Sequence, residues 1–201
     1  MLVPGLTVTL AMTELARRHL VAGTARLSGA FLVFVAIALG VAVGNELAES
    51  LVGDVRSFAP RRLPDWSLTL ALAVAPLAFA ALLRARLRDL PWLWVASTIG
   101  YTAVRAGALL FDTALAALVG SLVVGILANV YDRRGWGPAA VPLVPGVLLL
   151  VPGSIGYRSL TSLLDQDVVV GVTAGFTMIL TAVALAGGLL VASVIVPPRR
   201  A

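Results

Sequence analysis

Polar side chains that could bind a small molecule gather directly after a Val-Pro-Gly sequence in an otherwise apolar chain. Ser154, Tyr157 and Arg158 follow this sequence at positions i, i+3 and i+4, and Thr161 and Asp165 continue the same spacing. Residues so spaced share one face of a helix. A guanidinium group on that face can hold a carboxylate through two parallel hydrogen bonds. The spacing therefore predicts a polar helix face that could bind an anionic or zwitterionic molecule.

Two further segments carry polar stripes with the same helical spacing. They are Thr98, Tyr101, Thr102 and Arg105 in one segment, and Thr7, Glu14 and Arg18 in the other. Glu14 and Arg18 are also spaced for an i, i+4 ion pair. Three stripes on three helices predict a lined interior cavity, because a charge within an apolar span is costly and indicates function. The alternative is that Arg18 and Arg105 lie near helix ends and extend to lipid headgroups.

The helices that position these residues are membrane helices. The chain has 201 residues, of which 60% are hydrophobic and 12% charged, and its mean hydropathy is +1.00. Several apolar runs are long enough to cross a ~30 Å hydrocarbon layer. The net charge of +5 lies at the edges of these runs, which indicates topology rather than nucleic-acid binding. The chain has no cysteine and no nucleotide-binding loop, so the sequence implies no metal and no cofactor.

Apolar runs between charges and helix breakers predict an all-α polytopic bundle with about seven helical segments. The segments are roughly residues 2–20, 26–47, 67–84, 90–105, 109–131, 138–164 and 168–196. One set of alternate connections is rich in arginine: Arg17, Arg18, Arg26, Arg84, Arg86, Arg88, Arg133, Arg134, Arg199 and Arg200. The other set holds Arg56, Arg61, Arg62, Arg105 and Arg158. Because cytoplasmic loops are enriched in basic residues, the first set and the C-terminus are expected in the cytoplasm.

The sequence matches itself after a shift of 148 residues. Pro4 and Gly5 then fall on Pro152 and Gly153, and Gly23, Ala36 and Gly40 fall on Gly171, Ala184 and Gly188. The hinge of the first copy is basic, ARRHL, whereas that of the second is acidic, LDQDV. The charge rule therefore predicts two copies in opposite membrane orientation, as in inverted-repeat transporters.

The second Val-Pro-Gly is expected near the bilayer midplane. About fourteen apolar residues precede Pro152, and about a dozen follow Gly153 before Asp165. Proline removes a backbone donor and glycine loosens the helix, so a broken helix is predicted. The ends of broken helices offer free N–H and C=O groups to substrates. The alternative is an ordinary proline kink in a packed helix.

The stretch SLVVGILANVYDRRGWGPAAVPLVPGVLLLVPGSIGYRSLTSLL and the final VPPRR resemble the C-terminal half of bacterial threonine/serine exporters. The stretch VPGLTVTLAMTELARRHLVAGTARLSGA resembles the end of that family's first half. The resemblance implies proton-driven export of threonine and serine across a bacterial inner membrane. Under this exporter reading, the helix breaks and polar stripes predict substrate contacts from Pro4, Gly5, Pro152, Gly153, Ser154, Tyr157, Arg158, Thr98, Tyr101 and Arg105, with Arg158 pairing the substrate carboxylate. Glu14 and Asp165 are the candidate proton carriers.

The pattern departs from a full exporter, which has ten spans in two duplicated halves. Residues 1–48 correspond to the last two helices of the first repeat, 49–66 to an extracytoplasmic linker and 67–201 to the second repeat. We therefore expect lipid, a small-molecule substrate, protons, and either a second copy or a partner half-subunit as partners. The alternatives are a subunit of a split succinate exporter and an intramembrane serine hydrolase built from Ser154 and His19.

Overall fold

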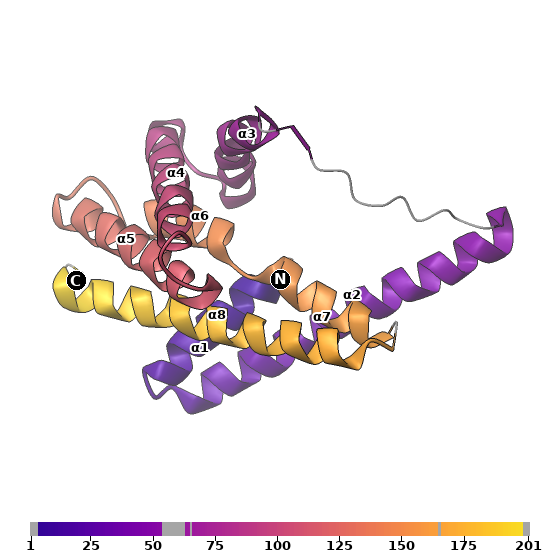
Figure 1. Cartoon of the computed structure of the whole chain (residues 1–201). Helices are drawn as coiled ribbons and strands as arrows, with labels where there is room; N and C mark the ends of the chain where they lie inside the picture. Colours follow the sequence, from indigo (N-terminus) through magenta and orange to yellow (C-terminus); the bar gives the residue numbers. More distant parts are fainter. Residues whose placement is uncertain (1–3, 54–62, 65, 165, 199–201) are drawn as a thin grey trace.

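The described residues of the chain form helices joined by short turns and contain no strand. The computed structural model describes residues 4–53, 63–64, 66–164 and 166–198. Its helices are α1 (Pro4–Ala16), α2 (Leu20–Val52), α3 (Trp66–Leu83), the short 3-10 turn η1 (Leu87–Asp89), α4 (Leu90–Gly107), α5 (Thr113–Arg133), α6 (Ala140–Leu150), α7 (Gly153–Leu164) and α8 (Val168–Ile195). Figure 1 shows them in chain order. The prediction of an all-α bundle is confirmed.

Five stretches of the described chain are long and apolar enough to cross a membrane. They are Leu20–Leu51, Trp66–Leu83, Thr113–Arg133, Ala140–Leu164 and Val168–Ile195. Helix α4 is less apolar and α1 has only 13 residues, so neither is among these five. The chain is thus a multi-pass membrane protein.

The predicted segments match the helices apart from their ends. The expected start at residue 109 is wrong, because residues 107–111 form a turn and α5 begins at Thr113. The Asp112 carboxylate accepts a hydrogen bond from the Leu115 N–H at 3.0 Å, which caps the first turn of α5. Helix α2 runs to Val52, five residues beyond its predicted end at 47.

The sixth segment is broken at Val-Pro-Gly, as the sequence predicts. Helix α6 ends at Leu150, and Val151 is extended with φ −63° and ψ 130°. A residue before proline avoids the helical region because the proline ring would clash with it, and Pro152 cannot donate a backbone hydrogen bond. Helix α7 then starts at Gly153. The break therefore follows from the local sequence.

The two copies detected by the 148-residue shift have the same local geometry. Arg18 and Gln166, which correspond, both adopt a left-handed conformation, with φ 65° and 64°. An added Cβ at Gly23 would lie 2.7 Å from Leu15 Cγ, and one at Gly171 would lie 2.6 Å from Leu163 Cγ. Leu15 and Leu163 also correspond. The α1–α2 and α7–α8 hairpins are therefore built alike.

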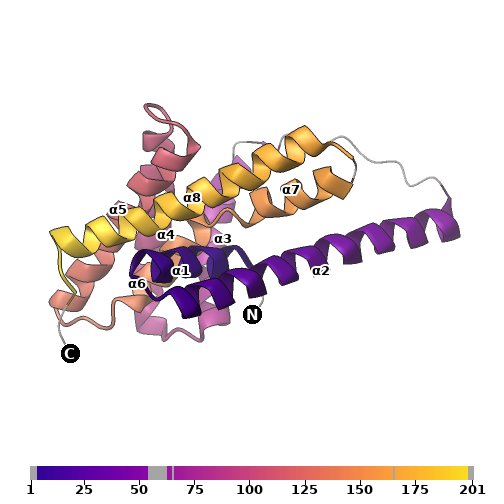
Figure 2. The same ribbon diagram turned by 90° about the horizontal axis from the view of Figure 1, so that it is seen from below.

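The two hairpins pack on each other in the middle of the molecule. Val8, Phe34 and Ala182 are buried together, and Met12, Leu27, Leu160 and Met178 pack around them. The Phe34 ring occupies space left by Gly156, since an added Cβ there would lie 2.8 Å from Phe34 Cζ. Helices α2 and α8 run in opposite directions in both views (Figures 1 and 2).

Helix α8 also packs closely along α5, through small residues on both helices. A Cβ added to Gly125 of α5 would lie 2.6 Å from the Cβ of Ala192. A Cβ added to Gly188 of α8 would overlap Ser121 and the Leu118 carbonyl, and would lie 2.9 Å from the Leu122 nitrogen. Asn129 of α5 donates a hydrogen bond to the Val196 carbonyl at 2.8 Å, beyond the end of α8. Together these contacts make α5 the neighbour of the C-terminal half of α8.

The close packing of α5 and α8 predicts a large difference between two adjacent glycines. Gly188→Ala is expected to lower the free energy of unfolding by about 1–3 kcal/mol, because its methyl group would meet the α5 backbone. Gly187→Ala should be neutral or stabilise slightly, because an added Cβ there meets nothing within 4 Å. Thermal unfolding of both variants in detergent measures the difference. Equal midpoints would contradict the packing described here.

Candidate functional site

The two Val-Pro-Gly sequences, which are 148 residues apart, meet in the structure. A Cβ added to Gly5 would lie 2.9 Å from the Gly153 Cα and 3.0 Å from the Gly153 nitrogen, and would overlap Val151. Glycine is required at position 5 because only a residue without a side chain permits this approach. Helices α1 and α7 therefore begin against each other and then run in different directions (Figure 1).

The meeting of two helix starts concentrates backbone donors at one place. Gly153 donates to the Val151 carbonyl at 2.9 Å and Gly156 to the Pro152 carbonyl at 3.2 Å. The remaining N–H groups in the first turn of a helix have no acceptor within that helix. Each helix start also carries roughly half a positive charge from the aligned peptide dipoles. Two such starts in contact form a positive region suited to an anion.

The residues after this junction lie along the outer side of α7. Ser154 and Arg158 are exposed, and Tyr157 is partly buried. The Thr161 hydroxyl donates within the helix, to the carbonyls of Tyr157 at 3.3 Å and Arg158 at 3.1 Å. Asp165, the second candidate proton carrier, lies outside the described residues. The α7 stripe is therefore accessible from outside this chain.

The polar stripe on α4 is also accessible, but the helices beside α4 differ from those beside α7. Thr98, Thr102 and Arg105 are exposed, and Tyr101 is partly buried. Helix α4 packs on α5, α6 and α3, whereas α7 packs on α8, α2 and α1. The expectation that the stripes line one interior cavity is therefore not met within the described chain. Helical periodicity gives the face of each helix but not which helices become neighbours.

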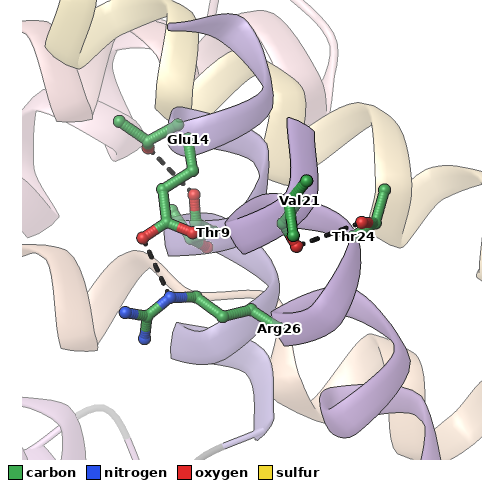
Figure 3. Close-up of polar contacts among 6 residues, drawn as sticks. Thr9, Glu14, Val21, Thr24 and Arg26 are labelled. Carbon is green, nitrogen blue, oxygen red and sulfur yellow. Dashed lines mark hydrogen bonds and ion pairs between the residues drawn. The ribbon is translucent and has the colours of Figure 1, made fainter. Parts of the chain in front are cut away.

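Glu14 pairs with a residue that the sequence reasoning did not select. Its carboxylate oxygen Oε1 lies 2.8 Å from Nε of Arg26 (Figure 3). The spacing suggested Arg18, but α1 ends at Ala16 and Arg18 lies in the turn with a left-handed backbone. Arg26 comes from α2, across the hairpin. The second carboxylate oxygen, Oε2, is buried and has no hydrogen-bond partner.

A groove of about 410 Å³ lies between α1 and α2, beside this ion pair. Its walls are Pro4, Thr7, Ala25, Arg26, Gly29, Ala30 and Val33. It extends from the first turn of α1, where Pro4 and Gly5 lie, to Arg26. The groove is mostly apolar and places one arginine near the junction of the two helix starts.

An aromatic cluster occupies a separate place, beside the end of α5. The ring centroids of Trp92 and Tyr131 lie 4.9 Å apart, and those of Trp92 and Trp136 lie 4.8 Å apart. The guanidinium carbon of Arg134 lies over the Trp136 ring, 5.0 Å from the ring centroid. Tryptophan and tyrosine are enriched at membrane surfaces. The position of this cluster at the start of α4 and the end of α5 therefore predicts a membrane boundary there.

Comparison with known proteins gives two family matches. Residues 68–195 match a family model described as threonine/serine exporter, and residues 1–48 match one described as putative threonine/serine exporter. Curated relatives are called pheromone-regulated membrane protein 10. The Saccharomyces cerevisiae protein is 23% identical over 98% of this chain and 57% of its own length. Those of Pichia sorbitophila and Debaryomyces hansenii are 26% and 28% identical over 79% of this chain, and 17% and 16% of their own lengths.

The chain thus spans about half or less of the length of these curated relatives. No solved structure matches it significantly.

Proposed function

Because the chain belongs to the threonine/serine exporter family, we propose that it exports threonine and serine in exchange for protons. Membership in this family makes the chain a transporter component. We further propose that threonine and serine are the substrates, that protons drive their export, and that the two copies have opposite membrane orientation. Bacterial inner-membrane location stays a prediction, since the curated relatives named above come from yeasts.

The observation that carries the proposal is the contact between the starts of α1 and α7. Two positive helix ends held together repel each other, and a bound carboxylate would relieve that repulsion. Transporters of amino acids use the starts of broken helices in this way. The backbone at Gly5 and Gly153 would then hold the carboxylate, and the adjacent Pro4 and Pro152 would keep the helix ends open.

Side chains of α7 would complete the site. Arg158 lies five residues after Gly153, which is roughly 7.5 Å along a helix. Its guanidinium group can form a two-point contact with a carboxylate. Ser154 and Tyr157 carry hydroxyl groups that can hydrogen-bond the hydroxyl of threonine or serine. The α4 residues Thr98, Tyr101 and Arg105 lie beside other helices and are not part of this proposed set of contacts.

Glu14 is suited to couple proton movement to transport. One oxygen of its carboxylate lies 2.8 Å from Nε of Arg26, while the other oxygen is buried without a hydrogen-bond partner. Protonation of Glu14 would remove the ion pair and free Arg26, which lines the groove that reaches Pro4. A proton can therefore change the charge beside the proposed substrate site. Asp165 remains the candidate for the second proton carrier.

A hydrolase built from Ser154 and His19 receives no support from the fold. Ser154 follows Gly153, which contacts Gly5 at the start of α1. His19 lies beyond the other end of α1, about 20 Å away at 1.5 Å per residue. A general base must lie within hydrogen-bond reach of its nucleophile. We therefore retain transport as the function.

Counterflow in proteoliposomes tests the transport proposal directly. Vesicles loaded with unlabelled threonine should accumulate labelled threonine and serine, and an inward proton gradient should drive net efflux of the amino acid. Labelled succinate is the third arm, because a dicarboxylate exporter would take it in preference. Vesicles without protein give the background. Exchange no faster than background for all three compounds would contradict the proposal.

The arginine distribution predicts the membrane orientation of the chain. Single cysteines at Ser50, near the end of α2, and at Gly135, between α5 and α6, are expected to react with an impermeant maleimide from opposite sides. Gly135 should react only from the cytoplasmic side. The natural chain has no cysteine, so it serves as the unlabelled control. Labelling of Gly135 from outside would reverse the orientation, and labelling of both positions from one side would contradict the inverted arrangement.

A further inference from the structure

A cavity of about 420 Å³ lies where two connections between membrane helices meet, and it shares no residue with the proposed substrate site. The connection between α3 and α4 supplies its charged residues, which are Arg84, Arg86, Arg88 and Asp89. The connection between α5 and α6 supplies Gly137 and Pro138. Helices α3, α4 and α6 supply its apolar walls, which are Leu83, Leu93, Val141 and Val144. The cavity therefore combines charged loop residues with apolar residues of three helices.

Three arginines and one carboxylate line this cavity, so its net charge is positive. Asp89 is only 9% exposed, and its oxygen Oδ1 lies 3.7 Å from Nε of Arg88. Arg84 and Arg86 are exposed, and within the described residues neither has an acidic partner. Two guanidinium groups thus remain for an anion after Asp89 has offset Arg88. Because a guanidinium group can hold a phosphate through two parallel hydrogen bonds, the cavity is suited to a phosphate group.

The cavity lies at the level where membrane spans end. Leu83 is the last residue of one apolar span and Ala140 is the first residue of another, and both line the cavity. The aromatic cluster predicts a membrane boundary at the same place, because tryptophan and tyrosine are enriched there. A second hollow of about 290 Å³ is lined by that cluster together with Arg88 and Asp89, which also line the cavity. The charged residues are therefore at the level of lipid headgroups, and the apolar walls are at the level of acyl chains.

We propose that this cavity binds an anionic phospholipid, with its phosphate group at Arg84 and Arg86 and the start of an acyl chain against the apolar walls. Basic pockets between membrane helices bind anionic headgroups in this way. A free phosphate has the same chemistry as the headgroup, but only a lipid also has hydrocarbon to contact Leu83, Val141 and Val144. The arginine distribution predicts that both connections are cytoplasmic, and the cytoplasmic leaflet is the one that carries anionic lipid.

Bound lipid would also attach α3 more firmly to the rest of the chain. Within the described residues, α3 packs chiefly on α4. The cavity has Leu83 of α3 on one wall and Val141 of α6 on another, so its occupant would contact both helices. Phosphatidylglycerol should therefore raise the thermal midpoint of the chain in detergent, and the zwitterionic lipid phosphatidylcholine should raise it less.

The backbone at Arg84 allows binding to be separated from folding. Arg84 has a left-handed conformation, with φ 50°, and the next residue, Ala85, donates to the Ala80 carbonyl at 2.9 Å to close the end of α3. Glycine is the commonest residue at such a position, because a Cβ is strained there. Arg84→Gly thus removes a guanidinium group while keeping the turn. Its thermal midpoint in lipid-free detergent should equal or exceed that of the natural chain.

Native mass spectrometry of the full chain in detergent measures lipid binding. The natural chain should bind phosphatidylglycerol at least tenfold more tightly than phosphatidylcholine. Arg84→Gly/Arg86→Gln should weaken binding of phosphatidylglycerol roughly 25-fold, because each arginine near an anionic lipid contributes about a fivefold change in affinity. Arg86→Gln alone leaves the turn after α3 unchanged and should weaken binding about fivefold. Arg133→Gln is the matched control, because Arg133 is exposed at the end of α5 but does not line the cavity.

Three results would overturn the proposal: equal affinity for the two lipids, unchanged binding in both Arg86 variants, or an equal loss in Arg133→Gln. Inorganic phosphate is the arm without hydrocarbon, and it should displace the lipid only at concentrations far above that of the lipid. Displacement at equal concentration would assign the cavity to a soluble phosphate compound and overturn the lipid. These measurements need no transport substrate, so they remain valid if the transport proposal fails.

Discussion

Replacing Arg158 by alanine is expected to lower the rate of amino-acid counterflow by roughly a hundredfold. Arg158 is exposed on α7, one to two turns after the junction of the two helix starts. A hydrogen bond to a charged group contributes about 1.5–3 kcal/mol, and each 1.4 kcal/mol is a factor of ten in affinity. Initial rates of labelled threonine exchange at low substrate concentration measure the loss.

Two further variants separate a substrate contact from a structural role. Arg158→Lys should recover only part of the activity, because an ammonium group lacks the planar fork of a guanidinium group. Arg133→Ala removes an exposed arginine at the end of α5 and should leave the rate unchanged. All three variants should reach the membrane in equal amounts. Normal exchange by Arg158→Ala would leave this residue without a role in substrate binding.

Gly5→Ala is expected to reduce exchange by about tenfold or more and to lower the thermal midpoint. Its methyl group would lie 2.9 Å from the Gly153 Cα, against backbone that cannot rotate away. Overpacking of this kind typically costs about 1–3 kcal/mol. The starts of α1 and α7 would be forced apart, and the two sets of backbone donors would no longer converge. Exchange rates and unfolding midpoints in detergent measure both effects.

The matched control is Gly153→Ala, at the corresponding position of the other copy. A Cβ added to Gly153 meets nothing within 4 Å, so this variant should keep both its stability and most of its activity. The contrast is specific to the contact described here, since the two glycines share the same local sequence. If both variants behave alike, the two helix starts do not meet as described.

Local features of the fold could be predicted from the sequence because they depend on nearby residues. The break after Leu150 follows from Pro152 and Gly153. The 148-residue shift also anticipated the equal hairpins, since Arg18 and Gln166 adopt the same unusual backbone conformation. The helix break and the left-handed residues each depend only on a few residues adjacent in the sequence.

The site could be predicted only in part, because it depends on contacts between distant helices. Periodicity placed Ser154 and Arg158 on one face of a helix but could not say that this face lies at the surface of the chain. It assigned Glu14 a partner four residues away, whereas the partner comes from the next helix. The contact between Gly5 and Gly153 had only an indirect signal, namely that both copies carry the same Val-Pro-Gly.

The length of α8 also makes the molecule responsive to the thickness of its bilayer. Its 28 residues carry no charge and span about 42 Å. A hydrocarbon layer of about 30 Å cannot contain such a rod upright, so α8 must incline or project beyond the lipid. Helix α2 is longer, with 33 residues, but its uncharged stretch from residue 27 to residue 44 spans about 27 Å and fits the layer without inclination. Shorter acyl chains would therefore incline α8 more than α2 and change the angle at which the two hairpins cross.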